Sequence, residues 1–101
     1  MESHSVRSPG ATVNIAGIEF DRVTYDDRGD VLYLHVGDPS SAVGFGATPE
    51  GDGTRFGPDG SLVGLTILNA RARFEREGGK IELTIPERRI VVDNISDILA
   101  A

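Results

Sequence analysis

Residues 25–36 read YDDRGDVLYLHV, and residues 56–67 read FGPDGSLVGLTI. The two stretches align without a gap at an offset of 31 residues (56 − 25). Each begins with an aromatic residue, carries a glycine at the same place (Gly29 and Gly60), and continues with an aliphatic run. Two units are too few for a solenoid. The repeat therefore predicts two similar β-hairpins within one sheet.

The residues at the centre of each hairpin favour a tight turn. Pro58 fixes φ for the first position of a type I turn, and Gly60 takes a positive φ without steric cost. In the first hairpin, Asp27 and Arg28 suit the same turn, with Gly29 as the glycine of a G1 bulge. We therefore expect a positive φ at both Gly29 and Gly60.

Alternation along the two aliphatic runs separates a core face from a second face. The predicted core face carries Leu32, Leu34, Val36, Val63, Leu65 and Ile67. The second face carries Val31, Tyr33, His35, Leu62, Gly64 and Thr66. Because the second set is half polar, we expect that face to be semi-exposed.

Upstream of the first hairpin, the hydrophobic pattern changes phase. Ile18 and Phe20 share one face of a strand, whereas Val23 and Tyr25 fall on the other. A β-bulge near residues 21–22 would reconcile the two halves.

The middle of the chain is less regular. Residues 37–53 are rich in Gly, Pro and Ser, which predicts a loop with at most a short strand at residues 43–47. For residues 69–77 two alternatives compete. One is a short helix capped by Asn69 and ended by Gly78, and the other is a strand leading into a two-glycine hairpin turn. The helix is favoured because Ala, Arg and Glu are good helix formers.

The C-terminal part predicts two more strands and a short helix. One strand is indicated by Ile81, Leu83 and Ile85, and another by Ile90 and Val92. Helical spacing then links Ile95, Ile98 and Leu99, behind a cap at Asp93 and Asn94. The chain is thus predicted to form one α+β domain over residues 12–101, after a polar, disordered tail at residues 1–11. Its architecture is a mainly antiparallel sheet of roughly five to seven short strands, with one or two short helices.

Composition excludes several classes of protein. The net charge is −6 and only 10 residues are Lys or Arg, whereas duplex binding needs clustered cations, so a nucleic-acid partner is not expected. Without cysteine there are no disulfides, thiolate metal sites or thiol nucleophiles. No apolar run has the length of a membrane span, and residues 1–11 lack the apolar region of a signal peptide. We therefore expect a cytoplasmic protein with no membrane association.

An aspartate-rich turn resembles a metal loop at first sight. Asp26, Asp27 and Asp30 lie close together, but the twelfth position counted from Asp26 is Gly37 rather than the glutamate of a calcium-binding EF-hand. The triplet at residues 28–30 spells Arg-Gly-Asp, which turn preference explains. We predict no metal site here.

Catalytic and cofactor-binding motifs are also missing. His35 has the chemistry of a general base, but no G-x-S-x-G nucleophile elbow accompanies it. The glycine-rich run at residues 44–53, GFGATPEGDG, matches neither phosphate-binding pattern. We predict no catalytic residue and no cofactor.

One group of arginines gathers in the second half of the chain. It comprises Arg71, Arg73, Arg76, Arg88 and Arg89, interleaved with Glu75, Glu77, Glu82 and Glu87. A solvated face of ion pairs is the favoured interpretation, and a surface for an anionic partner is the alternative.

The hairpin residues resemble a known family. They match the pattern of the small bacterial family called domain of unknown function 2283 at Tyr25, Asp26, Asp30, Leu32, Tyr33, Asp59, Gly60 and Gly64. The resemblance covers roughly residues 20–75 and implies the fold. It also implies an antitoxin-like role, as partner of a small ribonuclease-type toxin. This chain departs from the family by its longer central loop and by an extension from about residue 78.

These observations favour a non-enzymatic protein-interaction module that binds a protein partner or forms a homodimer. The predicted interaction surface is the second face, with Val31, Tyr33, His35, Leu62 and Thr66. The alternative is a small-ligand binder or an enzyme that uses the central loop at residues 37–53.

Overall fold

Both predicted hairpins form, and they lie in one antiparallel sheet. The computed structural model describes residues 6–7, 12–85 and 88–100. Within them, a six-stranded sheet has the strand order β1-β4-β5-β8-β7-β6, with antiparallel neighbours throughout. Its strands are β1 (Val6–Arg7), β4 (Arg22–Asp26), β5 (Val31–His35), β6 (Gly44–Ala47), β7 (Gly53–Phe56) and β8 (Leu62–Leu68). The predicted α+β class and antiparallel sheet are confirmed.

The pairing of β5 with β8 gives the two hairpins a pseudo-twofold relation. Leu34 pairs with Leu65, and these two residues occupy the same position in the sequence repeat. On one side of this pair Leu32 lies opposite Ile67. An axis between the two leucines therefore exchanges the hairpin β4–β5 with the hairpin β7–β8.

The turn of the second hairpin follows the prediction. Gly60 has a φ of 85°, and its N–H donates to the carbonyl of Gly57 at 2.9 Å. The N–H of Gly57 in turn donates to the carbonyl of Ser61 at 2.9 Å. This is the predicted type I turn closed by a glycine in the left-handed region.

The turn of the first hairpin differs by one residue. The positive φ of 56° falls on Asp30, so the prediction for Gly29 is wrong. The Asp26 carboxylate accepts the N–H groups of Arg28 (3.1 Å) and Gly29 (3.3 Å), an Asx turn that extends the loop by one position. Aspartate tolerates the left-handed region better than most side chains.

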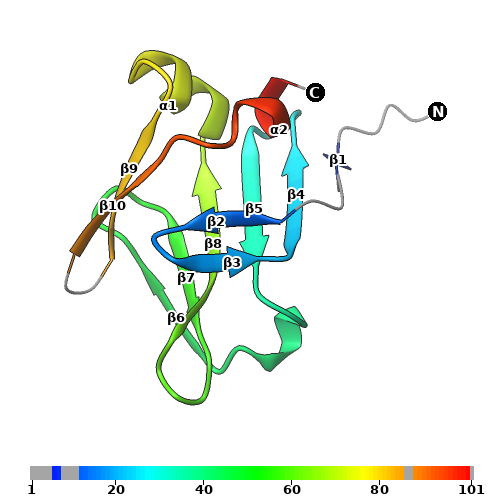
Figure 1. Ribbon diagram of the computed structural model, residues 1–101, viewed down its shortest axis with the longest axis vertical. Helices are drawn as coiled ribbons and strands as arrows, with labels where there is room; N and C mark the ends of the chain where they lie inside the picture. Colours follow the sequence, from blue (N-terminus) through cyan, green and yellow to red (C-terminus); the bar gives the residue numbers. More distant parts are fainter. Residues whose placement is uncertain (1–5, 8–11, 86–87, 101) are drawn as a thin grey trace.

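Two small hairpins cover one face of the main sheet. They are formed by β2 (Val13–Ile15) with β3 (Ile18–Phe20), and by β9 (Ile81–Ile85) with β10 (Arg88–Val92). Figure 1 shows β2 and β3 running across β8, β5 and β4. The predicted bulge near residues 21–22 is wrong, because the phase changes where the chain leaves β3 and enters the main sheet at β4.

A single hydrophobic core lies between these layers. It joins the inner face of the main sheet to the small hairpins and the C-terminal helix. Its buried residues are Val13, Ile15, Phe20, Val23, Tyr25, Leu32, Leu34, Leu65, Ile67, Ala70, Ile81, Leu83, Ile85, Ile90, Val92, Ile95, Ile98 and Leu99. Of the predicted core face, Val36 and Val63 are only half buried.

The helical alternative for residues 69–77 is confirmed, although not its cap. Helix α1 (Ala70–Arg76) follows Asn69, whose side chain makes no capping hydrogen bond. The carboxylate of Asp30 takes that role instead. Gly78 and Gly79 have positive φ and donate to the carbonyls of Glu75 and Phe74 at 3.3 and 2.7 Å, which is a Schellman ending.

The C-terminal helix α2 (Ser96–Ala100) also forms as predicted. The side-chain amide of Asn94 donates to the carbonyl of Asn14 at 2.9 Å, and so connects this end of the chain to β2. The predicted tail at residues 1–11 lies outside the described residues, except for β1. Neither described helix has the length and apolar composition needed to cross a membrane.

Candidate interaction surface

The face of the main sheet that points away from the core carries three rows of residues, set by the strand register. This surface corresponds to the second face predicted from the sequence, and we keep that name for it. One row is Thr24, Tyr33, Thr66, Gly53 and Ala47. The next is Arg22, His35, Gly64, Arg55 and Phe45, and the third is Asp26, Val31 and Leu68.

Large hydrophobic side chains on this face are open to solvent. The exposed fraction is 44% for Tyr33, 43% for Leu68 and 70% for Phe45. They come from β5, β8 and β6, so the exposed groups extend across the sheet rather than along one strand. A gathering of exposed apolar groups is typical of a site of contact with another molecule.

The structure separates the predicted surface residues into three groups. Tyr33 is exposed, and Val31 and Thr66 are half buried on the second face. His35 lies on this face but is only 6% exposed, so the prediction of a semi-exposed side chain is wrong for it. Leu62 pairs with Phe56 beside a β-bulge and packs against the core, because the bulge disturbs the alternation of faces.

Sequence reasoning missed the contribution of the central segment to this face. Phe45 and Arg55 lie opposite each other on β6 and β7, and the Arg55 guanidinium carbon is 5.6 Å from the centre of the Phe45 ring, a cation–π distance. The signal available was the expected short strand at residues 43–47. Nothing in the sequence indicated that this strand joins the same sheet as Tyr33.

A shallow groove of about 400 Å³ runs over this part of the second face. Phe45, Arg55, Thr66 and Leu68 line it, and Gly53 contributes no side chain to fill it. A smaller hollow of about 120 Å³ lies next to it and shares Arg55 and Thr66.

The groove ends at an open edge of the sheet. β6 pairs with β7 on one side, and no described strand pairs with its other side. Its sequence, Gly-Phe-Gly-Ala, has neither charge nor proline to discourage a further strand.

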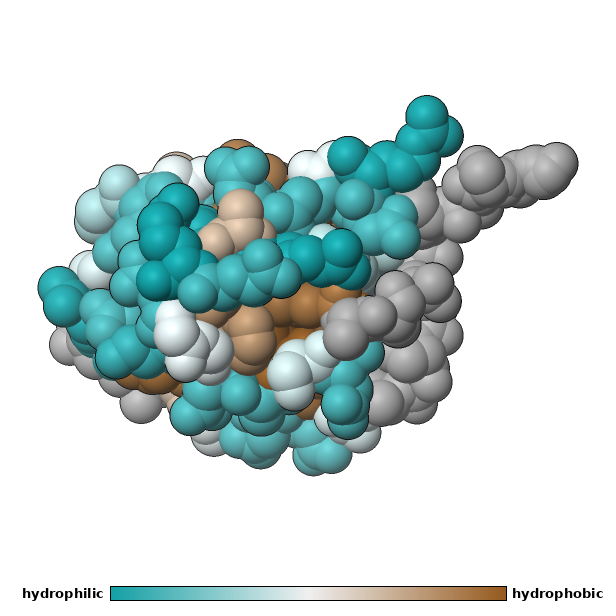
Figure 2. All heavy atoms as spheres, turned by 90° about the horizontal axis from the view of Figure 1, so that it is seen from above, coloured by the Kyte–Doolittle hydropathy of each residue, from teal (hydrophilic) through white to brown (hydrophobic). Residues whose placement is uncertain are grey.

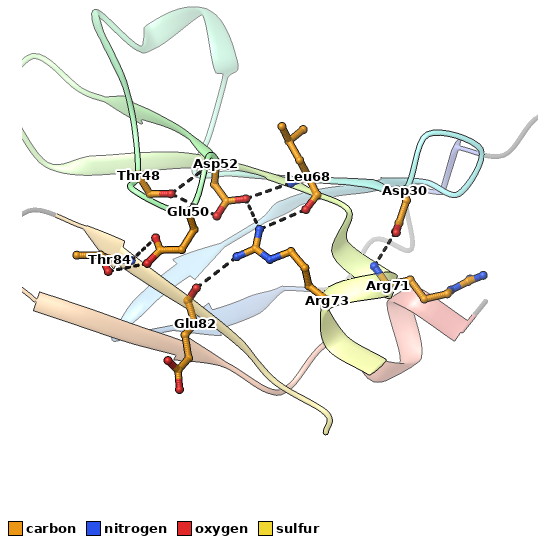
Figure 3. A network of polar contacts seen from close by, with 9 residues as sticks. All are labelled: Asp30, Thr48, Glu50, Asp52, Leu68, Arg71, Arg73, Glu82 and Thr84. Carbon is orange, nitrogen blue, oxygen red and sulfur yellow. Dashed lines mark hydrogen bonds and ion pairs between the residues drawn. The ribbon is translucent and has the colours of Figure 1, made fainter. Parts of the chain in front are cut away.

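Behind this edge, a buried carboxylate holds the tip of the hairpin β6–β7 (Figure 3). Asp52 is fully buried, and its carboxylate accepts hydrogen bonds from Arg73 (2.6 Å), the N–H of Leu68 (3.2 Å) and the hydroxyl of Thr48 (3.3 Å). Arg73 also donates to the carbonyls of Leu68 and Glu82 at 3.2 and 3.3 Å. The hairpin tip is thereby attached to both α1 and β9.

A second connection joins the same tip to β9. The Glu50 carboxylate accepts the N–H of Thr84 at 2.9 Å and its hydroxyl at 2.8 Å. These two hydrogen bonds lower the pKa of Glu50 to about 2. These hydrogen bonds therefore hold the C-terminal end of β6, which Glu50 follows, in place.

A similar arrangement joins the first turn to α1. The Asp30 carboxylate accepts the N–H groups of Arg71 (2.6 Å) and Ala72 (3.1 Å) and the hydroxyl of Tyr25 (2.7 Å). Although burial opposes it, these hydrogen bonds lower the pKa of Asp30. Burial, and then the bond to Asp30, raises the pKa of Tyr25 to about 12. Asp30 thus has a structural role.

A further hollow, of about 600 Å³, lies beside the arginine group. Its charged lining residues are Glu50, Arg73, Arg76, Glu77, Glu82 and Arg89, so positive and negative charges are equal in number. Arg76 lies 3.7 Å from Glu77, and Arg89 lies 3.5 Å from Glu82. Arg71 donates to the carbonyl of Leu99, and the side chain of Arg88 is outside the described residues. This geometry fits the ion-paired interpretation.

Neither the aspartates nor the central loop forms a reactive cluster. Among the described residues, no group of three or more His, Asp or Glu side chains could hold a metal ion. In the central loop, Asp38 accepts the N–H of Ser40 at 2.9 Å, and the Ser41 hydroxyl donates to the Asp38 carbonyl at 2.7 Å. These bonds stabilise the short 3-10 turn η1 (Pro39–Ser41).

Figure 2 looks down on the end of the molecule with α1 and α2, where a hydrophobic patch lies among hydrophilic residues. Comparison with protein-family models, curated proteins and solved structures found no match. The resemblance to domain of unknown function 2283 therefore stays a prediction.

Proposed function

We propose that the protein is a non-enzymatic interaction module whose second face docks against a partner protein. The observation that carries this proposal is the exposure of Tyr33, Phe45 and Leu68 on one face of the sheet, of which β6 is an edge strand among the described strands. Aromatic side chains are enriched at the centres of protein interfaces. Extended segments commonly add to open sheet edges.

The hydrogen bonds of His35 and of the central loop favour binding over catalysis. The described Ser40 and Ser41 form hydrogen bonds within their own loop, and the Nδ1 atom of His35 lies 2.9 Å from the carbonyl oxygen of Val36. A nucleophilic mechanism needs a base within hydrogen-bond reach of its nucleophile. Among the described residues, neither of these serines is hydrogen-bonded to His35, so no such pair supports the alternative of an enzyme that uses the central loop.

The function is tested by photo-crosslinking in the native host. A benzoylphenylalanine is introduced separately at Tyr33, Phe45, Leu68 and, as a matched control, Val91, which is 48% exposed on β10. We expect the first three positions to give the same crosslinked protein band and the control to give none. Equal crosslinking at all four positions, or crosslinking at Val91 alone, would contradict the proposal.

A further inference from the structure

The smaller hollow on the second face has a mainly apolar surface and the size of one aromatic ring. Its volume of about 120 Å³ is close to that of a protein cavity of about 150 Å³ that holds benzene. The side chains of Leu34 and Leu65 are buried in the core, so the paired backbone of β5 and β8 forms the floor of the hollow. The other lining residues are Tyr33, His35, Arg55 and Thr66.

Gly64 is the reason that the His35 imidazole lies at this hollow. The two residues are paired neighbours on β8 and β5. A Cβ atom on Gly64 would lie 2.7 Å from Cδ2 of His35, which is closer than real Cβ atoms approach. Only glycine therefore permits the imidazole to lie over β8, where His35 is 6% exposed.

The hydrogen bonding of His35 leaves one acceptor unsatisfied. Nδ1 lies 2.9 Å from the carbonyl oxygen of Val36, and because a carbonyl only accepts, Nδ1 carries the hydrogen. The other nitrogen of the neutral ring, Nε2, is then an acceptor. It is buried and has no hydrogen-bond partner among the described residues. Buried polar atoms are rarely left unpaired, so this atom points to a donor supplied by another molecule.

Arg55 covers the imidazole but does not supply that donor. Phe45 and His35 lie on opposite sides of Arg55 in the same row of the sheet, and the guanidinium carbon lies 5.6 Å from the centre of the Phe45 ring. The guanidinium is therefore turned away from His35, while the carbon stem of Arg55 packs over Gly64 beside the imidazole. Arg55 forms no salt bridge with a described residue. Since the contact with Phe45 is weak, the stem can move aside and open the path to Nε2.

The geometry points to this hollow as the binding site for the indole ring of a tryptophan in the partner protein. The inference rests on the proposed interaction function and names the side chain that the second face receives. Indole is an apolar ring system whose N–H group donates one hydrogen bond and accepts none. This is the chemistry that a single buried acceptor in an apolar hollow requires. The N–H edge enters beside His35, and the six-membered ring lies in the adjoining groove, which Phe45 and Leu68 line.

Other side chains fit this hollow less well. A carboxylate only accepts hydrogen bonds, and a lysine or arginine would bring its charge into an apolar space. Serine and threonine donate through a hydroxyl group but are too small to fill the adjoining groove. The hydroxyl of tyrosine also donates, but its oxygen brings acceptor lone pairs into the same apolar space. Tryptophan is moreover enriched at the residues that dominate binding in protein interfaces.

The test uses two blocked tripeptides that differ in one atom group of the same bicyclic ring. One is Leu-Trp-Leu, and in the other benzothienylalanine replaces the tryptophan, so that sulfur takes the place of the N–H. Each is titrated into the isotope-labelled full chain and followed by NMR. We expect the Trp peptide to shift the amides of Tyr33 and Thr66 and to bind at least roughly fivefold more tightly, as one hydrogen bond to a buried acceptor predicts. This preference should disappear in His35→Leu and persist in Arg55→Ala.

A second measurement uses the unchanged chain, so it does not depend on how well His35→Leu folds. Long-range proton–nitrogen spectra of the imidazole resolve the two ring nitrogens of His35. We expect the Trp peptide to shift the Nε2 resonance while Nδ1 keeps its hydrogen, and the benzothienylalanine peptide to leave Nε2 unchanged.

Three outcomes would overturn the inference: equal affinity for the two peptides, a preference that is unchanged in folded His35→Leu, or tighter binding of a Leu-Tyr-Leu peptide. Free indole that binds as tightly as the Trp peptide would also contradict it, because the ligand would then be a small molecule. The crosslinks at Tyr33, Phe45 and Leu68 test the interaction function separately. A positive crosslinking result with no preference for the Trp peptide would remove the indole site alone.

Discussion

Leu34 and Leu65 are the residues at which the two hairpins meet, and each is only 2% exposed, as the sequence predicted. Replacing either by alanine should lower the free energy of unfolding by about 2–5 kcal/mol, because the lost methyl groups leave a cavity in a close-packed core. The free energy of unfolding of an ordinary domain is only about 5–15 kcal/mol. Urea titration measures the loss. The matched control is Leu68→Ala, at an exposed position of the same sheet, and a loss below about 1 kcal/mol at Leu34 would mean that the two faces are reversed.

At the scale of elements, helix α1 depends on a carboxylate 41 residues away in sequence. Asp30→Ala removes the cap of α1 and leaves the Tyr25 hydroxyl without its acceptor, so we expect a loss of about 1–3 kcal/mol. Asp30→Asn should lose less, because asparagine tolerates the left-handed backbone and retains an acceptor. Asp27→Ala in the same turn is the control. Equal urea midpoints for Asp30→Ala and Asp27→Ala would contradict the capping role.

The hairpin β6–β7 should contribute to the acid sensitivity of the fold through Glu50. Its pKa in the folded protein is about 2, below the ordinary value of 4.5. The contribution of Glu50 is therefore fully present above about pH 4.5 and is lost as the pH falls toward 2. Thermal melts between pH 7 and pH 2 should show a shallower decline for Glu50→Gln than for the unchanged chain. Glu50 is exposed and screened by solvent, so the difference is small. An unchanged pH profile for Glu50→Gln, matching the control Glu77→Gln, would exclude this contribution.

The sequence predicted those elements that depend on residues close together in the chain, such as strands with alternating hydrophobic residues and turns closed by glycine. The buried positions Leu32, Leu34, Leu65 and Ile67, the turn at Gly60 and the end of α1 at Gly78 were predicted correctly for this reason. The turn at Gly29 was missed because of a local Asx turn at Asp26, but two other features that were missed depend on partners distant in the sequence. Asp30 caps α1 across 41 residues, and the burial of His35 depends on the absence of a side chain at Gly64 on the neighbouring strand.

For the whole molecule, the open edge of β6 favours self-association, which the net charge opposes. Two copies of a chain with a net charge of −6 repel each other at low ionic strength, and salt screens this repulsion. We expect light scattering over a concentration series to show a homodimer that is favoured as the salt concentration rises. A lysine discourages pairing at a sheet edge, so Phe45→Lys should abolish the dimer while Val91→Lys should not. If the mass at high protein concentration is that of a monomer at low and at high salt alike, only a different protein could be the partner.

The pseudo-twofold axis between Leu34 and Leu65 has a consequence for how the chain folds. Each hairpin closes through a short loop, a microsecond process for isolated hairpins, whereas the central β5–β8 pair joins residues that are distant in sequence. We therefore expect the rate-limiting event to be the docking of two preformed and equivalent halves. Because the halves are equivalent, Leu34→Ala and Leu65→Ala should slow folding to the same degree in stopped-flow measurements. Unequal rates would show that one half forms first and acts as a template for the other.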